Sequence, residues 1–483
     1  MPSPSAVATT ARVSASADQV VAALIGRARA AQAKIDRFTQ DQADTLVAAA
    51  GWAILEPSRN KALAELAVAD TGLGNVADKI TKNHRKTLGL LRDLKGAPSV
   101  GVINEDNERG LTEIARPVGV VAAITPSTNP GATPANKIIN ALKGRNAVIL
   151  APSPKGWSTC ALLLRFIHAE FDKIGAPHDL VQILPAPVTK ELTHALMRQA
   201  DLIVATGSQA NIRAAYASGT PAFGVGAGNV ASIIDASADL EEAAAKIARS
   251  KTFDNATSCS SENSVIIDEK VYEPAVAALT RAGGVLLDGA EKARLQEALW
   301  PGGKLSATLI AQAATQIART VGIGGRIGSR IGETPSFLMV EESGFGPDHP
   351  FSGEKLSPVL AVYRASGFEA ACEIVKQIYA YQGAGHSVSL HSADPAQALK
   401  LGLELEVGRV IVNQAHAIAT GGSFDNGLPF SLSMGCGTWG GNSFSDNMSY
   451  RHYLNITRIS RPIAEKVPTT DELLGGYLQR YGA

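Results

Sequence analysis

The sequence predicts an α/β protein made of two doubly wound parallel-sheet domains and a small extended element. Apolar, strand-like runs alternate with helical segments from residue 118 to about residue 412. The runs lack the polar alternation of a half-exposed sheet, so helices should cover both faces of each sheet. A helical stretch and a polar, hairpin-like segment precede the alternation. Together these observations predict the domain layout.

The N-terminal region is expected to be helical, because apolar residues such as Val20, Leu24, Leu46 and Leu63 recur at helical spacing. Ahead of it, residues 1–17 are rich in Ser, Ala and Thr and lack a charged start followed by an apolar block. They predict a loose tail rather than a signal peptide.

Residues 100–117 predict a β-hairpin, since two extended runs flank a polar tip at residues 104–110. An isolated two-stranded ribbon is barely stable. Two interpretations stay open: the hairpin pairs with another subunit, or it folds back on its own domain.

Strands and helices then alternate as in a dinucleotide-binding domain. The expected strands are residues 118–125, 147–151, 180–184 and 202–206, and the expected helices are 135–142, 157–173, 190–199 and 209–218. A second, less regular alternating block covers about residues 265–412, and the chain from residue 435 returns to short extended stretches.

Composition narrows the function classes. The 483 residues are enough for two or three domains. Lys+Arg and Asp+Glu both number 45, and this zero net charge argues against a nucleic-acid or anionic-membrane partner. No apolar run approaches the ~18 residues that cross a bilayer. The four cysteines show no Cys-x-x-Cys spacing, so we expect no disulfide framework, no metal site and a cytoplasmic location.

Cys259 is the most informative residue. It lies among small hydroxyl and amide residues, in TFDNATSCSSENS, just before the apolar run at 265–267. Small neighbours leave a sulfur within reach of a substrate, and the thiolate is the nucleophile of covalent catalysis. A lone cysteine is more often an inert buried side chain, so the segment alone leaves both interpretations open.

Three further segments follow strands or carry glycines. The segment TPSTNP, which contains Asn129, follows the first strand of the alternating block. Open α/β sheets bind ligands at such strand ends. Asn129 either donates a hydrogen bond to an oxyanion or forms a turn before Pro130. Gly207 and Ser208 open a helix in the position of an anion site, or form an ordinary turn. The glycines of residues 224–229 indicate close backbone approach, unusual φ angles or a tight turn.

These segments resemble the aldehyde dehydrogenase superfamily, and more narrowly its CoA-acylating branch, which includes the aldehyde domain of bifunctional aldehyde–alcohol dehydrogenases. The similarity covers nearly the whole chain after about residue 100. Its most specific segments are TPSTNP, ATGSQANIRAAYASGTPAFGVGAGN, FDNATSCSSENSVI, EKLSPVLAVY, GHSVSLHS and GCGTWGGNS.

The resemblance implies a mechanism. Cys259 attacks the aldehyde carbonyl to give a thiohemiacetal, and Asn129 is the oxyanion donor, together with the backbone N–H at the cysteine. Hydride then passes to a nicotinamide and leaves a thioester on Cys259. Glu354 holds the nicotinamide ribose. The other implied cofactor contacts are Thr125, Pro126, Ser127, Ser153, Gly207, Ser208, Gly226 and Leu356. The implied substrate contacts are Ser258, Ser260 and His386, the last also being a candidate proton carrier or a structural histidine.

Two departures from the wider superfamily shape the functional prediction. Hydrolytic members carry a Glu ahead of a glycine pair, where this chain has Gly224-Val225-Gly226. Without that base the thioester should pass to another thiol, which is CoA in this branch. Where hydrolytic members have a Lys that binds the adenosine ribose, this chain continues Ala151-Pro152-Ser153. The choice between NAD and NADP is therefore open, and Lys155 either meets a 2′-phosphate or is a solvated lysine.

The substrate prediction rests on FDNATSCSSENS, which most resembles acylating sulfoacetaldehyde dehydrogenases. Ser258, Ser260 and Ser261 suit an oxygen-rich anion, although small hydroxyls could equally just leave room. Succinate semialdehyde and acetaldehyde are the alternative substrates. A hydrolytic aldehyde dehydrogenase and a non-catalytic nucleotide-binding protein are the alternative functions.

The expected organisation follows from the resemblance. Residues 1–100 form the helical N-terminal part of the cofactor domain, 101–117 the hairpin of an oligomerisation element, and 118–250 the dinucleotide-binding domain. Residues 251–430 form the catalytic domain, and 431–483 return to the cofactor domain and end in an oligomerisation segment. The partners should be an aldehyde, CoA and further copies of the chain, as a homodimer or homotetramer.

Overall fold

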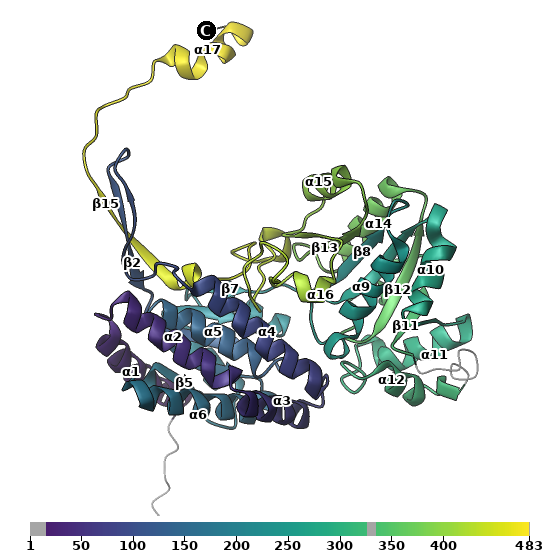
Figure 1. The fold of residues 1–483 in the computed structure, drawn as a ribbon, viewed down its shortest axis with the longest axis horizontal. Coiled ribbons are helices and arrows are strands. Elements are labelled where there is room, and N and C mark those ends of the chain that lie inside the picture. Colours follow the sequence, from purple (N-terminus) through teal and green to yellow (C-terminus); the bar gives the residue numbers. More distant parts are fainter. Residues whose placement is uncertain (1–15, 326–334, 483) are drawn as a thin grey trace, which may run out of the picture.

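The computed structural model describes residues 16–325 and 335–482, and it divides into two lobes with a projecting ribbon (Figure 1). The predicted N-terminal tail lies outside the described residues, apart from its last two. Each lobe is built around a parallel sheet, as the sequence predicts. The segments between the lobes hold most of the predicted site residues, so the following paragraphs take each lobe in turn.

Four helices form the N-terminal part of the first lobe. They are α1 (Ala17–Ile35), α2 (Gln40–Leu55), α3 (Pro57–Thr71) and α4 (Val76–Leu94). Capping boxes at Ser16 and Thr39 fix the starts of α1 and α2, and a proline opens α3. The helical N-terminal region is therefore confirmed, and α4 extends it toward the second lobe.

The first sheet has the strand order β5-β4-β3-β6-β7, and all its pairings are parallel. Its strands are β3 (Val120–Thr125), β4 (Ala147–Pro152), β5 (Val181–Ile183), β6 (Leu202–Ala205) and β7 (Ala222–Gly224). The helices between them are α5 (Ala132–Lys143), α6 (Trp157–Ile174), α7 (Lys190–Gln199) and α8 (Gln209–Ala217). The strand order reverses between β3 and β6, so the ligand crevice should open where these two strands end.

The second sheet has the strand order β10-β11-β12-β9-β8-β13-β14 within the described residues. Its strands are β8 (Val230–Ile234), β9 (Glu262–Asp268), β10 (Gly284–Leu286), β11 (Phe337–Glu341), β12 (Val359–Ala365), β13 (Val388–His391) and β14 (Val410–Val412). Its helices are α9 (Leu240–Thr252), α10 (Tyr272–Arg281), α11 (Gly289–Leu299), α12 (Ala314–Thr320), α14 (Phe368–Tyr381), α15 (Pro395–Glu404) and α16 (His416–Ala419).

One predicted domain boundary needs correction. The sequence-based division at residue 250 falls inside α9, and β8 pairs with β9 in the second sheet. The chain therefore crosses between the lobes in the glycine-rich stretch 224–229. The sequence misplaced this boundary because β8 continues the same alternation of strand and helix, with no linker composition to mark the change of sheet.

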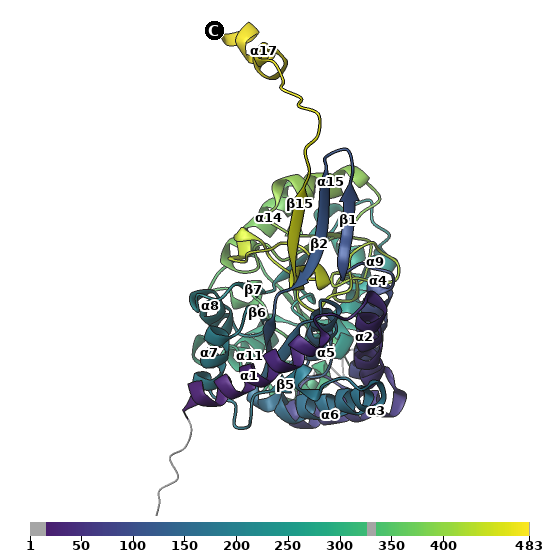
Figure 2. The same cartoon turned by 90° about the vertical axis from the view of Figure 1, so that its left-hand side faces the viewer.

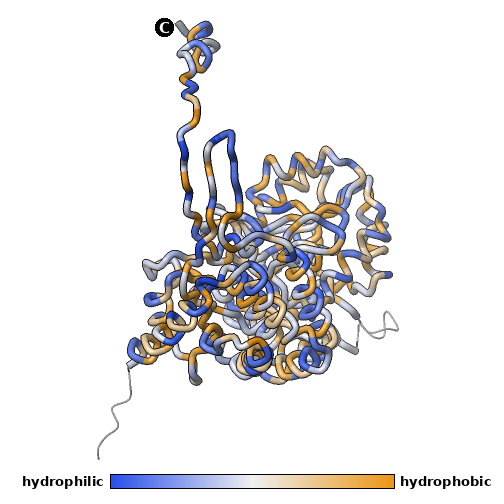
Figure 3. The backbone as a smooth tube through the Cα atoms, turned by 60° about the vertical axis from the view of Figure 1, so that its left-hand side comes forward, coloured by the Kyte–Doolittle hydropathy of each residue, from blue (hydrophilic) through white to orange (hydrophobic). Residues whose placement is uncertain are grey.

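The projecting ribbon is an antiparallel sheet of β1 (Gly101–Asp106), β2 (Leu111–Pro117) and β15 (Leu454–Ser460). The predicted hairpin is confirmed, and its third strand comes from the C-terminal part of the same chain (Figure 2). Beyond β15 the chain runs away from both lobes to α17 (Thr470–Tyr481). Hydrophobic and hydrophilic positions are interleaved along this projecting tail (Figure 3).

The segment before β15 returns to the first lobe. Phe444, Tyr450 and Tyr453 belong to the same hydrophobic core as β3 and β4. The chain thus reaches the first lobe again after the second one, as predicted. Among the described residues, no helix combines the length and the apolar character needed to cross a membrane.

Candidate active site

A cavity of about 620 Å³ lies between the lobes and collects most of the predicted site residues. Its walls come from the ends of β3, β4 and β6 in the first lobe, and from segments that lead into β8, β9 and β12 in the second lobe. Carboxyl ends of one parallel sheet thus face amino ends of the other. The predicted residues that line it are Thr125, Pro126, Ser127, Asn129, Ser153, Gly207, Ser208, Gly226, Ser258, Cys259, Glu354 and Leu356.

The loop before Cys259 has an unusual backbone. Asp254, Asn255 and Ala256 all have left-handed φ angles, of 51°, 52° and 59°. Such a conformation costs about 1–3 kcal/mol per residue and persists only where the surroundings enforce it. Contacts of the Asp254 side chain hold the loop in this conformation.

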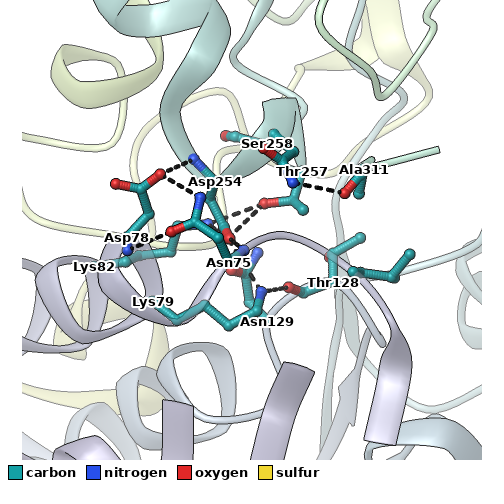
Figure 4. Close-up of polar contacts among 12 residues, drawn as sticks. Asn75, Asp78, Lys79, Lys82, Thr128, Asn129, Asp254, Thr257, Ser258 and Ala311 are labelled. Carbon is teal, nitrogen blue, oxygen red and sulfur yellow. Dashed lines mark hydrogen bonds and ion pairs between the residues drawn. The ribbon is translucent and has the colours of Figure 1, made fainter. Parts of the chain in front are cut away.

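Asp254 is fully buried and is held by two lysines of α4 (Figure 4). Its Oδ2 lies 3.1 Å from Nζ of Lys79 and 2.5 Å from Nζ of Lys82, and it accepts a hydrogen bond from Thr257 Oγ1 at 2.8 Å. Burial alone would raise the pKa of this carboxyl, but Lys82 and Lys79 outweigh it and hold the pKa below its usual value. The ion pairs therefore hold the loop before Cys259 against α4.

Lys82 also reaches Asn129. Its Nζ donates to Asn129 Oδ1 at 2.8 Å, in addition to Asp254 and Thr257 Oγ1. An ammonium group only donates, so the carbonyl oxygen of the Asn129 amide must face Lys82. The amide nitrogen is then turned the other way, and it has no partner among the described residues. Asn129 is oriented as an oxyanion donor requires.

Cys259 is a half-buried free thiol. Burial raises its pKa to about 12, and the charges of Glu354 and Cys436 add to the effect. The resting group is therefore a protonated thiol at neutral pH, and a proton must leave when the sulfur attacks.

His386 contacts Cys259 and is not among the residues that line the cavity. Its Nε2 lies 3.4 Å from Cys259 Sγ, and its Nδ1 lies 2.7 Å from Ser387 Oγ. Burial, with the charges of Arg409 and His416, keeps its pKa well below the usual value, so the imidazole is neutral. The interpretation of His386 as a direct substrate contact is therefore corrected: it does not line the cavity, and it is placed to exchange a proton with the thiol.

The serines flanking Cys259 separate into two groups. Ser258 lines the cavity, whereas Ser260 and Ser261 are buried. The hydroxyl of Ser260 faces the sulfur of Met434 at 3.8 Å. The prediction that Ser260 contacts substrate is thus wrong, because the turn into β9 directs its side chain into the protein.

The glycine cluster at 224–229 allows close backbone approach. A Cβ atom at Gly228 would lie 2.2 Å from the carbonyl oxygen of Cys259, and one at Gly226 would lie 2.9 Å from Cys436 Sγ. The backbone N–H of Gly226 donates to Asn442 Oδ1 at 2.8 Å. Of the predicted explanations, close approach applies and left-handed φ angles do not, since none of these glycines has a positive φ.

The comparisons with known proteins decide the family. Residues 2–296 match the model of the aldehyde dehydrogenase family. The chain belongs to this family. It is 68% identical over 467 residues to the acylating sulfoacetaldehyde dehydrogenase of Cupriavidus necator, an alignment that covers 96% of this chain and 94% of the relative.

Two further relatives support the acylating branch. The acetylating succinate-semialdehyde dehydrogenase of Clostridium kluyveri is 37% identical, over 94% of this chain and 98% of its own. The crystal structure of an acetylating aldehyde dehydrogenase from Geobacillus thermoglucosidasius superposes with a TM-score of 0.88 at 36% identity, covering 94% of this chain and 98% of that one. The resemblance inferred from the sequence is confirmed: this protein is an acylating aldehyde dehydrogenase.

This aldehyde dehydrogenase has no room for the hydrolytic base. A Cβ atom at Gly224 would lie 2.7 Å from Ile212 Cγ2 and 2.8 Å from the ring of Tyr216. Tyr216 is itself fixed, because its hydroxyl accepts from the N–H of Gly224 at 2.9 Å. The missing carboxylate is therefore a property of the packing as well as of the sequence.

The far end of the main cavity suits a dinucleotide. Gly207, with φ of 149°, leads into the N-terminus of α8, where Ser208 caps the helix by accepting from the N–H of Asn211. Such a helix start attracts a pyrophosphate. Lys190 and His194 of α7 line the same end, whereas Lys155 is exposed and lies outside the lining. Glu354 lies at the other end, and burial raises its pKa to about 8.

A second, smaller cavity lies beside the nucleophile. It has a volume of about 320 Å³ and shares Asn129, Ser258 and Leu432 with the main cavity. Its remaining walls are Asp78, Thr81, Lys82, Arg85, Lys86, Arg249, Thr252, Phe253, Ala417 and Ile418. Four of these are basic residues, and we call this space the cationic cavity.

Sequence reasoning missed Lys79, Lys82, Arg85 and Arg249. The two lysines stand three residues apart on α4, far along the chain from Asp254, so the sequence showed basic residues on a helix and no partner for them. Asp254 was inside the quoted catalytic segment, but only the fold reveals what it holds.

Proposed function

We propose that this enzyme catalyses the reversible oxidation of sulfoacetaldehyde to sulfoacetyl-CoA, with NAD or NADP as hydride acceptor and CoA as acyl acceptor. The observation that carries the proposal is a nucleophile and an oxyanion donor in a site with no carboxylate at residue 224, where hydrolytic members carry their base, in a chain 68% identical to an acylating sulfoacetaldehyde dehydrogenase. A chain that only bound nucleotides would need neither Cys259 nor an amide oriented by Lys82.

In the first step the sulfur of Cys259 bonds to the carbonyl carbon, and the carbonyl oxygen takes up negative charge. The thiol proton leaves as the bond forms, and His386 Nε2 is the neutral acceptor in contact with the sulfur. The Nδ2 donor of Asn129 stabilises the oxyanion. Lys82 strengthens that donor, since it holds the amide oxygen and polarises the amide.

In the second step the oxyanion re-forms its C=O bond and the aldehyde hydrogen leaves with its electron pair. The nicotinamide ring of the cofactor would supply the acceptor for this hydride when it is bound. The acyl group then remains as a thioester on Cys259. Gly207 and Ser208 would hold the pyrophosphate of the cofactor and Glu354 its nicotinamide ribose, which the two ends of the cavity fit.

In the third step the thiol of CoA attacks the thioester. Its sulfur bonds to the acyl carbon, the bond to Cys259 breaks, and the Cys259 sulfur regains a proton. Water is a poor competitor, because the packing of Tyr216 and Ile212 against Gly224 leaves no room there for the carboxylate that activates water in hydrolytic members. The acyl group is therefore kept for a thiol.

A substrate panel tests the proposal. Purified enzyme would be assayed with sulfoacetaldehyde, succinate semialdehyde and acetaldehyde, each with NAD or NADP and with or without CoA. We expect CoA-dependent reduction of the nicotinamide, with the highest kcat/KM for sulfoacetaldehyde. Equal rates without CoA would contradict acyl transfer, and a higher kcat/KM for acetaldehyde would contradict the substrate.

We also propose that the enzyme is a homodimer or homotetramer in the cytoplasm. Leu473, Leu474, Tyr477 and Tyr481 of α17 are all largely exposed on a helix that projects beyond both lobes. Exposed apolar side chains of this kind are covered in an assembly. Removing residues 461–483 should lower the number of chains per particle, as measured by light scattering. An unchanged number of chains would contradict this role.

The cytoplasmic location rests on a different observation. All four cysteines are free, which suits a reducing compartment.

A further inference from the structure

We propose that the cationic cavity is the subsite for the anionic end of the aldehyde, and that Arg85 and Arg249 bind it. The inference deepens the proposed function and rests on it. The aldehyde carbonyl would lie between Cys259 and Asn129, and the sulfonate would point away from the cofactor cavity toward the two guanidinium groups.

The position of the cavity supports this. Asn129 and Ser258 belong to the walls of both cavities, so the reacting centre is their meeting point. The main cavity carries the predicted cofactor contacts. A substrate tail therefore has its own space on the other side of Asn129, between α4, α9 and α16.

The donors of the two lysines in the cationic cavity are already used. Lys82 directs its ammonium to Asn129, Asp254 and Thr257. Lys86 donates to the carbonyl oxygens of Gly421 at 2.8 Å and Gly422 at 3.0 Å, and lies 3.5 Å from that of Ile418. An ammonium has three donors. These lysines therefore build the walls and leave few hydrogens for a ligand.

The two arginines do have donors to spare. Within the part of the chain that the structure describes, Arg85 makes one hydrogen bond, from Nη2 to Ser423 Oγ at 3.3 Å, and its guanidinium lies over the ring of Phe424 at 5.3 Å. Arg249, in the last turn of α9, has no hydrogen bond or ion pair with the described residues. A guanidinium carries five N–H donors in a fixed fork that suits oxyanions. Arg85 and Arg249 are thus the available ligands.

The carboxylates nearby do not neutralise these arginines. Asp78 faces the cavity, but its Oδ2 accepts from Asn75 Nδ2 and from the N–H of Asp254, so it serves the nucleophile loop. Asp425 is exposed, and its pKa is lowered first by a hydrogen bond from Ser423 and then by Arg85 and Arg249. It makes no ion pair with either arginine within the described residues.

The surroundings of the two arginines differ. Phe253, Ile418 and Leu432 supply half-buried apolar walls and Arg85 is half-buried, whereas Arg249 is exposed to solvent. Charges interact more strongly where water is excluded, which favours the contact with Arg85. Burial, with the charges of Arg85 and Lys82, lowers the pKa of Lys86 to about 7. The cavity therefore has an excess of positive charge that a bound anion would relieve.

Kinetics of paired substrates test the subsite. The variants Arg85→Gln, Arg249→Gln and the double variant would be compared on sulfoacetaldehyde and acetaldehyde, in the CoA-dependent assay with the full-length protein. We expect kcat/KM for sulfoacetaldehyde to fall about 10- to 100-fold per arginine, because charge-assisted hydrogen bonds are lost. The values for acetaldehyde should stay within about twofold, since it has no charged tail. Ethanesulfonate should inhibit the wild type competitively against sulfoacetaldehyde, and the double variant only weakly.

Arg92→Gln is the matched control. Arg92 lies on the same helix and over the same Phe424 ring, but it pairs with Asp93 and does not line the cavity. We expect it to leave the ratio of the two substrates unchanged. If the arginine variants lose both substrates equally, or if Arg92→Gln shifts the ratio as much, the subsite is contradicted. Absence of CoA-dependent oxidation in the wild type would instead contradict the proposed function.

Discussion

The two cavities that meet at Asn129 and Ser258 have opposite chemistry. The main cavity is lined largely by small residues, among them Gly207, Ser208 and Gly226. The cationic cavity is lined by long charged side chains, among them Arg85 and Arg249. A cofactor shared by a whole family can be held by backbone groups, whereas a particular aldehyde needs side chains that differ between members.

The two cavities also distinguish residues that act in catalysis from residues that select the aldehyde. Changes at the shared wall should affect every aldehyde alike, because they alter the reacting centre. Changes confined to the cationic cavity should alter only the preference among aldehydes. The predictions below test this separation, beginning with the largest expected effect.

Loss of the nucleophile should abolish turnover of all aldehydes. We expect Cys259→Ala to lower kcat by at least about 10⁴-fold with sulfoacetaldehyde and acetaldehyde alike. The measurement is CoA-dependent nicotinamide reduction. Cys372→Ala is the control, since this buried cysteine of α14 belongs to the core of the second lobe. Substantial turnover by Cys259→Ala would remove the proposed mechanism.

Loss of the oxyanion donor should cause the second-largest loss of kcat. We expect Asn129→Ala to reduce kcat about 10²- to 10³-fold, the usual effect of removing one donor from an oxyanion hole. Because Asn129 belongs to both cavities, the loss should be similar for charged and uncharged aldehydes. A loss confined to sulfoacetaldehyde would place Asn129 with the specificity residues instead.

A comparison of Lys82 with Lys79 distinguishes a role in positioning Asn129 from a contribution to the stability of the fold. Both pair with Asp254, but only Lys82 donates to Asn129. We expect Lys82→Met and Lys79→Met each to lower the free energy of unfolding by about 3–5 kcal/mol, as for a broken buried ion pair. Only Lys82→Met should also lower kcat strongly, by about tenfold or more. Equal kcat losses in the two variants would contradict the positioning role.

The pH dependence of substrate preference is the smallest expected effect. Lys86 has a pKa of about 7 and faces Arg85 and Lys82 of its own helix and the carbonyl groups of residues 418, 421 and 422. Arg249 of α9 and Asp425 are the other charged groups near Arg85. A bound anion favours its protonated form, so anion affinity is greatest below pH 7 and declines as the pH rises above 7. The ratio of kcat/KM for sulfoacetaldehyde to that for acetaldehyde should fall about two- to fivefold between pH 7 and pH 8.5. A rising ratio would contradict the account.

The sequence predicted the elements that depend on local pattern. Strands β3 to β6 of the first sheet, the helices between them and the hairpin follow from apolar periodicity and turn residues, whereas the short edge strand β7 was not predicted. Cys259, Asn129 and the missing carboxylate near Gly224 followed from the family resemblance. The elements depend on the physics of short segments, whereas the site residues depend on motifs shared with the family.

What the sequence could not supply depends on long-range contact. Lys82 and Asp254 are 172 residues apart, and only folding brings α4 against the nucleophile loop. His386 was predicted to contact substrate and contacts the thiol instead, while Ser260 turns into the core. The change of sheet before β8 was invisible, since a buried parallel strand looks the same in either domain.

The central claim is that the acyl group waits on Cys259 for a thiol. Rapid mixing of the enzyme with sulfoacetaldehyde and its nicotinamide, without CoA, tests it most directly. We predict a burst of reduced nicotinamide equivalent to one per Cys259, followed by a stall that adding CoA relieves. Continued turnover at the burst rate without CoA would show that water accepts the acyl group, and would contradict the account.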